Sequence, residues 1–493
     1  MNLQTALLDV GQMRQADILS IAANVSGVQL MQNAGSAVAK EIRQRWSARP
    51  ITVICGPGSN GGDGFVVARQ LADAGWSVRV ALLCAREHLI GEAAYHAARW
   101  HGPIEPVSNA TLQAAELVVD ALYGAGLSRP LDGAALEILA AATRKKIPIV
   151  SIDVPSGLMG DTGEVMGAVP AVLTVTFFRK KPGHVLLAGR ALCGELIVAD
   201  IGTPAAVWSE LRPNTFENAP ALWLASLTQP QLSDNKYTRG HALVYGSYPL
   251  TGAARMAARA AARVGAGLTT IVVPEAALPV YAAALSSIMV QPMASLVDLE
   301  RLLQDKRFTA LLIGPGAGTS ETTLNAVLAM LATGRATLLD ADAITVFERN
   351  PAALDRAILG PCVITPHDGE FARVFDATGD KLTRARDAAR RTGAVVVLKG
   401  ADTVIAAPDG RAVINTNAPA TLATAGAGDV LGGMVLGLLA QGMEPFLAAC
   451  AAVWLHGAAA TSFGPGLLAE DIPDLLPKTL ASLSALHCLR DNT

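Results

Sequence analysis

Residues 423–433, Ala-Thr-Ala-Gly-Ala-Gly-Asp-Val-Leu-Gly-Gly, place a turn of small residues and one carboxylate directly before an apolar run. Gly426 and Gly428 permit a close backbone approach that a Cβ atom would block. The apolar run predicts a helix, whose first N–H groups would face the turn and attract an anion. Asp429 would repel a phosphate there unless it accepts a proton from a substrate hydroxyl group. The structural alternative is that Asp429 only caps the helix.

The composition indicates a globular chain of about two to four domains. Of the 493 residues, 51% are hydrophobic and 16% are charged, and the formal net charge is −3. A chain with this charge balance and only 4% aromatic residues shows no electrostatic or stacking surface for nucleic acid. We therefore expect no nucleic acid and no membrane among its partners.

The cysteines and the apolar segments favour a cytoplasmic location. The six cysteines form no Cys-x-x-Cys pair, as is typical of reduced thiols in the cytosol. Residues 1–14 lack the basic segment and apolar core of a signal peptide. The uncharged run 445–469 contains His456, Pro465 and three glycines, which favour a buried helix and a loop over a membrane span.

The first half of the chain begins with a strand, a glycine-rich loop and a helix. Residues 51–55 are apolar, residues 56–64 read Gly-Pro-Gly-Ser-Asn-Gly-Gly-Asp-Gly, and residues 65–74 are amphipathic. This order is typical of a phosphate- or dinucleotide-binding crossover, although the Gly-Lys-Ser/Thr ending of a P-loop is missing. Asn60 and Asp63 suggest contacts to a ligand, while the alternative is a turn closed by Asx hydrogen bonds.

Two later strands also end in polar side chains. Asp120 follows residues 117–119, and Asp153 and Ser156 follow residues 147–152. Because the carboxyl ends of parallel strands share one edge of a sheet, we expect these groups to meet at a ligand crevice. Oxygen ligands without histidine or cysteine suit a hard cation better than zinc.

Three motifs of this half together resemble the NAD(P)H-hydrate epimerase family over roughly residues 10–205. They are the loop at 56–64, Val-Asp-Ala-Leu-Tyr-Gly-Ala-Gly-Leu at 119–127 and Ile-Asp-Val-Pro-Ser-Gly at 152–157, with Ser59 in place of the family's first loop asparagine. The resemblance implies that Asn60, Asp120 and Ser156 bind a potassium ion and that Asp153 contacts the substrate as acid/base. It further implies that the hydrated nucleotide is held by Ser59, Asn60, Gly61, Gly62, Asp63, Gly124, Ala125, Gly126, Leu127, Ser128, Arg129, Pro130 and Asp153.

A stretch rich in proline and asparagine at residues 202–240 separates two α/β patterns. We place the boundary near residue 220, which gives one domain over 1–220 and another over 221–493. In the second domain, strands alternate with helices and predict a large, mostly parallel sheet between helices. These strands are expected at 241–245, 269–273, 310–313, 336–339, 362–364, 395–398 and 404–407.

The second half resembles the ribokinase-like superfamily and, within it, the ADP/ATP-dependent NAD(P)H-hydrate dehydratases. The motifs that carry this resemblance are Gly-Pro-Gly-Ala-Gly at 314–318, Asp-Ala-Asp-Ala at 340–343, Pro-His-Asp-Gly-Glu at 366–370 and Lys-Gly-Ala-Asp-Thr at 399–403. The fold expected is thus α/β, a Rossmann-like three-layer α/β/α domain followed by a ribokinase-like α/β/α domain. The approach to the Asp429 loop, residues 417–421, departs from the usual Thr-Gly-Asn-Pro-like sequence.

The second resemblance implies two sets of site residues. The adenine nucleotide would contact Lys399, Gly400, Ala401, Asp402, Thr403 and Gly428. The hydrated substrate would contact Ala253, Gly316, His367 and Asp429. Asp340 and Asp342 either position water bound to Mg²⁺ or have structural roles.

The two resemblances together imply repair of hydrated NADH and NADPH. The first domain would interconvert the R and S epimers, and the second would dehydrate the S epimer while converting ADP to AMP and phosphate. Asp429 would remove the hydroxyl proton so that a phosphoryl group can be transferred, with Mg²⁺ bridging the nucleotide phosphates. The alternative is a vitamin or sugar kinase with a non-catalytic N-terminal binding module. We also expect a homo-oligomer.

Overall fold

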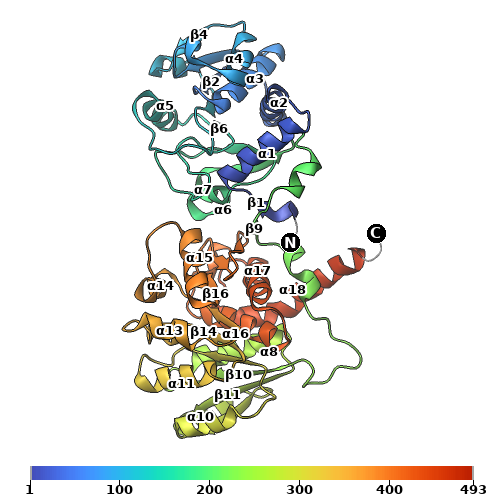
Figure 1. Ribbon diagram of the computed structural model, residues 1–493, viewed down its shortest axis with the longest axis vertical. Helices are drawn as coiled ribbons and strands as arrows, with labels where there is room; N and C mark the ends of the chain where they lie inside the picture. Colours follow the sequence, from blue (N-terminus) through green and yellow to red (C-terminus); the bar gives the residue numbers. More distant parts are fainter. Residues whose placement is uncertain (1–2, 491–493) are drawn as a thin grey trace. The chain divides into compact units, whose positions relative to one another are not determined.

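The structure is a computed structural model that describes residues 3–490. It contains two compact units: one spans Ala6–Thr215, and the other consists of the chain from Phe216 onward together with residues 3–5. We call them the N-terminal and the C-terminal unit and describe each by itself (Figure 1). The sequence prediction of an α/β fold is confirmed for both.

The N-terminal unit is built on a seven-stranded parallel sheet in the order β4-β3-β2-β5-β6-β7-β8. Its strands are short apolar runs, as expected for a sheet covered on both faces. They are β2 (Ile51–Cys55), β3 (Val78–Leu82), β4 (Ile104–Pro106), β5 (Leu117–Ala121), β6 (Ile149–Ile152), β7 (Leu173–Phe177) and β8 (Glu195–Ala199).

Side chains of successive strand residues enter two separate cores. In β2, Val53 and Cys55 pack in the core that also contains Phe65, whereas Ile54 packs in the core that contains Ile138. This alternation is the period of a β-strand, and it produces three layers. The helices are α1 (Val10–Ala22), α2 (Gly27–Arg45), α3 (Ser59–Asp73), α4 (Gly91–Ala98), α5 (Gly133–Arg144), α6 (Pro182–Val185) and α7 (Leu187–Leu192).

The glycine-rich segment corrects one sequence expectation. We expected a loop up to Gly64 and a helix from Phe65, but α3 already begins at Ser59. Glycine is a poor helix former, so propensity alone argues against a helix here. Tertiary packing reverses this preference, because a Cβ atom on Gly61 or Gly62 would lie under 3.0 Å from Gly56 or Met31. Only three residues therefore separate β2 from a helix whose residues 60–63 are buried.

The C-terminal unit contains a larger sheet in the order β9-β18-β17-β16-β15-β14-β13-β10-β11-β12. Pairing is parallel from β12 to β16 and antiparallel for β16–β17 and β17–β18. The strands are β9 (Thr215–Glu217), β10 (His241–Tyr245), β11 (Leu268–Pro274), β12 (Met289–Met293), β13 (Ala310–Ile313), β14 (Ala336–Leu339), β15 (Cys362–Ile364), β16 (Val395–Leu398), β17 (Val404–Ala406) and β18 (Ala412–Ile414). The seven predicted strands are present, whereas β9, β12 and β18 were not predicted.

Helices cover this sheet, and α16 packs closely on α8. A Cβ atom on Gly433 or Gly437 would lie under 3.0 Å from the backbone of Ala257 or Ala261 in α8, so the two helices meet through glycine. The helices are α8 (Gly252–Val264), α9 (Leu278–Ala284), α10 (Leu296–Leu302), α11 (Glu321–Leu331), α12 (Asp342–Thr345), α13 (Pro351–Ala357), α14 (Asp368–Val374), α15 (Lys381–Thr392), α16 (Ala427–Ala440), α17 (Pro445–Phe463) and α18 (Ile472–Arg490).

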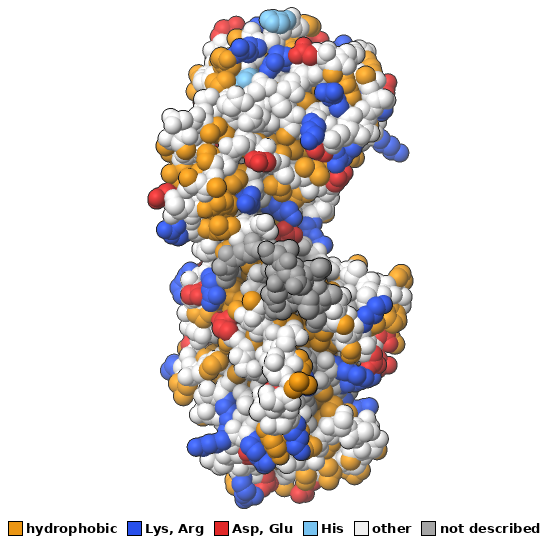
Figure 2. Space-filling view, turned by 90° about the vertical axis from the view of Figure 1, so that its right-hand side faces the viewer, with side chains coloured by type: hydrophobic (Ala, Val, Ile, Leu, Met, Phe, Trp, Pro, Cys, Tyr) orange, Lys and Arg blue, Asp and Glu red, His pale blue; other side chains and the backbone are white. Residues whose placement is uncertain are grey.

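Helix α17 is long and apolar enough to cross a membrane by length and composition, but 67% of its most apolar window is buried inside the unit. It contacts α16, α18 and three strands of the sheet, as a core helix does. Figure 2 shows positive and negative side chains interspersed over one face of the molecule, in line with the small net charge.

Candidate active sites

The N-terminal unit contains a cavity of about 670 Å³ at the carboxyl ends of β2, β5 and β6. One face of α1 and the first turn of α3 complete its wall. Ten residues predicted from the sequence line it, namely Ser59, Asn60, Asp63, Gly124, Ala125, Gly126, Leu127, Ser128, Arg129 and Asp153. Gly61, Gly62 and Pro130 are outside the lining, and the first two pack against neighbouring residues instead.

Asp153 occupies the centre of this site in a left-handed backbone conformation, with φ of +67°. A non-glycine residue in that region is strained, and such strain persists where surrounding contacts hold it. Its Oδ2 accepts a hydrogen bond from the N–H of Ala125 (2.9 Å), and its Oδ1 accepts one from Thr176 Oγ1 (2.9 Å). The carboxylate is therefore held by one residue that follows β5 and by one residue of β7.

Lys181 is the residue of this site that the sequence analysis missed. Its Nζ lies 2.6 Å from Asp153 Oδ1, and its side chain is only 3% exposed. Burial raises the pKa of Asp153, but the charge of Lys181 and the hydrogen bonds from Lys181 and Ala125 oppose burial, and the pKa falls to about 2. Asp153 is therefore a carboxylate at neutral pH.

The His184 side chain contacts the backbone of Asp153. The backbone N–H of Lys181 donates to His184 Nδ1 (2.9 Å), so the ring proton is on Nε2, which lies 2.8 Å from the carbonyl oxygen of Asp153. Burial lowers the pKa of His184 to about 4, which keeps the ring neutral. The signal for both residues in the sequence was the run Arg-Lys-Lys-Pro-Gly-His after the strand at 173–178.

Two further carboxyl groups face the cavity. Burial, together with the charges of Asp153 and Asp17, raises the pKa of Asp63 well above its usual value. Burial also raises the pKa of Asp17, on α1, to about 6, although Lys181 opposes this shift. The cavity thus contains one firmly ionised carboxylate and two that hold a proton more readily.

Asp120 and Ser156 lie next to each other, as the shared edge of a parallel sheet predicted. Ser156 Oγ donates to Asp120 Oδ1 (2.6 Å), and the Ser156 N–H donates to Oδ2 (2.8 Å). Burial raises the pKa of Asp120, while these hydrogen bonds oppose the shift. Asn60 is buried on the cavity side, and its Nδ2 has no hydrogen-bond partner among the described residues.

In the C-terminal unit, Asp429 lies in the first turn of α16. The helix N-cap is Gly426, whose φ of +87° suits glycine, so the alternative reading of Asp429 as the N-cap is wrong. Burial raises the pKa of Asp429 to about 6; Asp340 and Glu370 add to this shift, and Lys399 opposes it. A carboxyl group with this pKa is suited to accept a proton near neutral pH.

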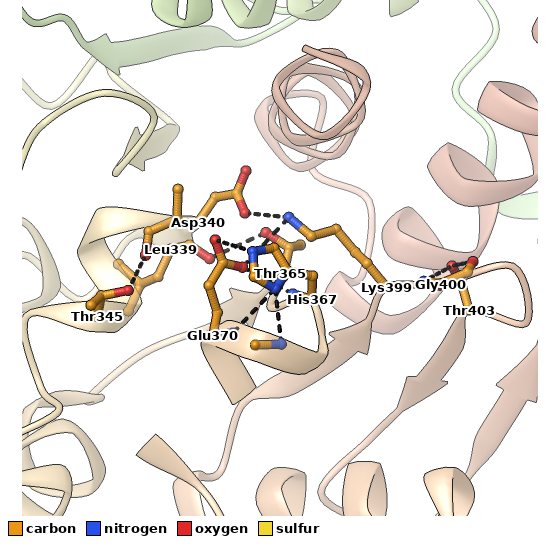
Figure 3. A network of polar contacts seen from close by, with 11 residues as sticks. Leu339, Asp340, Thr345, Thr365, His367, Glu370, Lys399, Gly400 and Thr403 are labelled. Carbon is orange, nitrogen blue, oxygen red and sulfur yellow. Dashed lines mark hydrogen bonds and ion pairs between the residues drawn. The ribbon is translucent and has the colours of Figure 1, made fainter. Parts of the chain in front are cut away.

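Lys399 lies in a polar network with Asp340 and Glu370 (Figure 3), and the charges of all three act on the pKa of Asp429. Its Nζ lies 2.8 Å from Asp340 Oδ1 and 3.9 Å from Glu370 Oε2. A Cβ atom on Gly428 would lie 3.4 Å from this Nζ, so the ammonium is next to the N-terminus of α16. Burial lowers the pKa of Lys399, but the negative charges of Asp340 and Glu370 raise it by more. The pKa of Lys399 therefore lies above its usual value.

His367 and Glu370 form the start of α14. The N–H of His367 donates to Glu370 Oε2 (2.9 Å), and the N–H groups of Gly369 and Glu370 donate to His367 Nδ1. The His367 ring is mostly exposed, and the backbone of His367 pairs with that of Lys399 in an isolated parallel β-bridge. The structure therefore brings His367, Lys399 and Asp429 to one edge of the sheet.

The remaining predicted residues lie on nearby loops. Gly316 has φ of +69°, and a Cβ atom there would meet Ser247 Oγ at 3.0 Å. Ala253 is the second residue of α8, which follows the same Ser247 loop. Residues 399–403 form a tight turn in which Thr403 Oγ1 donates to the carbonyl oxygen of Gly400 (2.8 Å).

Asp340, Asp342 and Asp402 each have a protein partner. Asp342 Oδ2 accepts from the N–H of Gly318 (2.8 Å), and Asp402 pairs with Lys381 (2.7 Å). Asp340 is 1% exposed and is held by Lys399. These contacts give all three carboxylates a structural role, whatever else they contact. The described residues contain no cluster of three or more histidine, cysteine or acidic side chains that could hold a metal ion.

Comparisons with known proteins match both units. Residues 27–183 match the family described as YjeF-related protein N-terminus, and residues 241–480 match the family described as NAD(P)H-hydrate dehydratase. A bifunctional NAD(P)H-hydrate repair enzyme of Moorella thermoacetica is 35% identical over 97% of this chain and 97% of its own length. The enzyme of that description from Escherichia coli is 33% identical over 94% of this chain and 90% of its own length. A solved ribokinase-like superfamily protein from Enterococcus faecalis is 25% identical, with a TM-score of 0.50, over 55% of this chain and 98% of that one.

Proposed function

The chain belongs to the family of bifunctional NAD(P)H-hydrate repair enzymes, and we propose that its two units carry out the two steps of that repair. The N-terminal unit interconverts the R and S epimers of hydrated NADH and NADPH. The C-terminal unit dehydrates the S epimer to NAD(P)H. The observation that carries this proposal is a carboxyl group with a shifted pKa at the site of each unit, Asp153 and Asp429, in a chain that matches bifunctional relatives over nearly its full length.

Epimerisation at C6 of the hydrated ring fits the N-terminal cavity. Opening and reclosing the ring requires proton transfers at the C6 hydroxyl and at the ring nitrogen. Asp153 is ionised and lines the cavity, so it is the base for the hydroxyl proton. The residues of Ser59–Asp63 and 124–130 that line the cavity would hold the nucleotide.

A potassium ion fits the oxygen donors beneath this cavity. Asp120 is a buried carboxylate that accepts hydrogen bonds from neutral groups of Leu122, Ser151 and Ser156, and Ser156 adds a hydroxyl oxygen. Asn60, with an unpartnered buried Nδ2, can turn its amide oxygen to a cation. Asn60, Asp120 and Ser156 would therefore hold the ion, which would neutralise charge and order the loop that starts α3.

Dehydration fits the C-terminal site if the hydroxyl group is first made a better leaving group. Asp429 takes the hydroxyl proton, and the oxygen accepts a phosphoryl group from ADP, which becomes AMP. Phosphate then leaves as the ring nitrogen supplies the electron pair, and loss of a proton from C5 restores the C5–C6 double bond of NAD(P)H. The open N-terminus of α16 and Lys399 lie where negative charge would gather. Mg²⁺, when bound with the nucleotide, would neutralise negative charge on its phosphates.

The contacts of the nucleotide and the substrate follow from this arrangement. We assign the nucleotide to the turn at residues 399–403 and to Gly428. We assign the hydrated ring to Ala253, Gly316, His367 and Asp429. Their shared edge of the sheet supports both assignments, because ligands of parallel sheets bind at the carboxyl ends of the strands.

A direct test is incubation of the full chain with mixed hydrate epimers, ADP and Mg²⁺, while the absorbance of reduced nicotinamide is followed. Recovery of both epimers faster than their spontaneous interconversion is the expected result. A phosphorylated product that accumulates without recovery of NAD(P)H would instead support the small-molecule kinase. Replacing ADP by ATP in parallel reactions measures the preference between the two donors.

We also propose that the chain works in the cytoplasm and self-associates. The five described cysteines are free thiols, four of them buried, which suits a reducing compartment. Light scattering on the purified chain measures its oligomeric state, and a monomeric mass would contradict self-association.

A further inference from the structure

Lys181 has bonding capacity that the protein does not use. Its Nζ donates to Asp153 Oδ1 (2.6 Å) and to Thr176 Oγ1 (2.9 Å). An ammonium group has three N–H donors. The third has no partner in the part of the chain that the structure describes, and Lys181 lines the cavity. One N–H is therefore left for a molecule bound there.

In the resting site, Asp153 is bound as a proton acceptor and not as a proton donor. Its carboxylate accepts hydrogen bonds from Lys181, Thr176 and Ala125, two of them at Oδ1 and one at Oδ2. Three donors on one carboxyl group favour the ionised form, which has no proton to give. The ring nitrogen therefore needs a different donor when its bond to C6 breaks.

We propose that Lys181 is the catalytic acid of the epimerisation, acting with Asp153 as the base. This inference rests on the epimerase function proposed above. Lys181 Nζ donates a hydrogen bond to Asp153 Oδ1, so the two groups are close enough for one bound ring to reach both of them. The assignment separates two roles that the sequence alone gave to Asp153.

The step balances without a further reactant. Asp153 removes the hydroxyl proton, the C6–N1 bond breaks to leave an aldehyde at C6, and N1 takes a proton from Lys181. Rotation about the C5–C6 bond turns the other face of the aldehyde to the nitrogen. N1 then attacks C6 and returns its proton to Lys181, while the oxygen recovers its proton from Asp153. Both side chains end as they began.

The surroundings of Lys181 fix its position. The residue is only 3% exposed. Thr176 and the backbone of Asp153, held by His184, keep the pair in place during the step. The charged side chains that face the pair from other elements are Asp17 of α1 and Asp63 of α3.

The first test is Lys181→Met in the full chain, with mixed epimers, ADP and Mg²⁺. The fast phase of NAD(P)H recovery reports dehydration of the S epimer, and the slow phase reports epimerisation. We expect the slow phase to fall by about 100-fold or to the spontaneous rate. The fast phase should be unchanged. Lys145→Met is the matched control, because Lys145 is an exposed lysine at the end of α5. An unchanged slow phase in Lys181→Met would overturn the proposal.

The second test separates a proton donor from a mere positive charge. In Lys181→Ala, methylammonium can enter the space of the lost side chain and carries N–H protons, whereas tetramethylammonium carries the same charge without them. We expect the slow phase to recover only with methylammonium. Equal slow phases in the two salts would overturn the proposal. If the slow phase of the unaltered chain is no faster than spontaneous epimerisation, the proposed epimerase function itself fails instead.

Discussion

Asp429 combines a raised pKa with a place at the open end of a helix. Burial and the nearby carboxylates of Asp340 and Glu370 disfavour its charged form, although Lys399 favours it. The helix N-terminus is at the same time an attractive place for the phosphate that the reaction produces. The residue thus accepts a proton at the position where negative charge is stabilised.

The first prediction concerns Asp429→Asn. The amide has nearly the shape of the carboxylate but cannot accept the hydroxyl proton, so dehydration should fall by more than about 100-fold. Nucleotide binding, measured by calorimetry with ADP and Mg²⁺, should be largely unchanged. Near-normal turnover of the variant with ADP or ATP would rule Asp429 out as the base.

The second prediction concerns the pH dependence of dehydration. A base with a pKa of about 6 is active when it has lost its proton, so kcat/KM should fall as the pH falls through about 6. Asp340→Asn removes a negative charge that raises this pKa and leaves Lys399 to lower it. The acid limb should therefore move to lower pH by about one unit.

Asp342→Asn is the control for this shift. Asp342 belongs to the same segment, but its carboxylate binds the N–H of Gly318 and does not contribute to the pKa of Asp429. The acid limb of the Asp342→Asn variant should lie at the same pH as that of the unaltered enzyme. An acid limb that stays in place in Asp340→Asn would show that the charge of Asp340 does not act on the base.

The sequence was informative about which polar residues meet and less informative about their protonation. Asp120, Asp153 and Ser156 follow apolar strands, and the common edge of a parallel sheet predicted their proximity. Lys181 could not be selected in the same way. It is one of two adjacent lysines, and which of them enters the cavity depends on where β7 ends and α6 begins.

At the scale of the elements, apolar runs predicted the central strands because those strands are buried on both faces. The edge strand β12 (Met289–Met293) was missed because it contains Gln291 and Pro292 and is half-exposed. The early start of α3 was missed for another reason. Its glycines have low helix propensity, and only the lack of space for side chains at Gly61 and Gly62 explains them.

The third prediction compares two adjacent glycines of α16. A Cβ atom on Gly433 would collide with the backbone of Ala257, whereas one on Gly432 would make an ordinary contact of 3.4 Å with Leu338. Gly433→Ala should therefore lower the free energy of unfolding by about 1–3 kcal/mol because α8 must move. Gly432→Ala should instead raise it by up to about 1 kcal/mol through helix propensity.

Residual dehydratase activity after heating measures this difference in the full chain. The epimerase rate of the same samples is the internal control, since neither glycine belongs to the N-terminal unit. Equal heat inactivation of the two variants would show that α16 and α8 can separate without cost.

At the scale of the whole molecule, the chain divides into two units that each contain a complete sheet and a site. Loss of one site should therefore leave the other in operation. The fourth prediction is that Asp153→Ala removes epimerisation and spares dehydration. With a roughly equal mixture of epimers, recovery of NAD(P)H should be fast for about half of the substrate and slow for the rest. A single fast phase to completion would show that Asp153 is not needed.

The last prediction concerns where the chain can be divided. The composition of the linker indicated a boundary near residue 220, but Asn218 is bound within the C-terminal unit and is 4% exposed. Its Nδ2 donates to Asn415 Oδ1 (3.0 Å) and to the carbonyl oxygen of Cys450 (2.9 Å), and its Oδ1 accepts from Trp223 Nε1 (3.2 Å). We propose that the C-terminal domain begins at Phe216.

A fragment that starts at Ala221 loses β9 and Asn218, and leaves the buried polar groups of Asn415, Cys450 and Trp223 without these partners. Each such group costs about 1–3 kcal/mol, so this fragment should melt well below one that starts at Phe216. The Phe216 fragment with Asn218→Ala should fall between the two, because it keeps the strand but not the amide. Thermal melting of the three fragments followed by circular dichroism makes the comparison. Equal melting temperatures would show that residues 216–220 are linker after all.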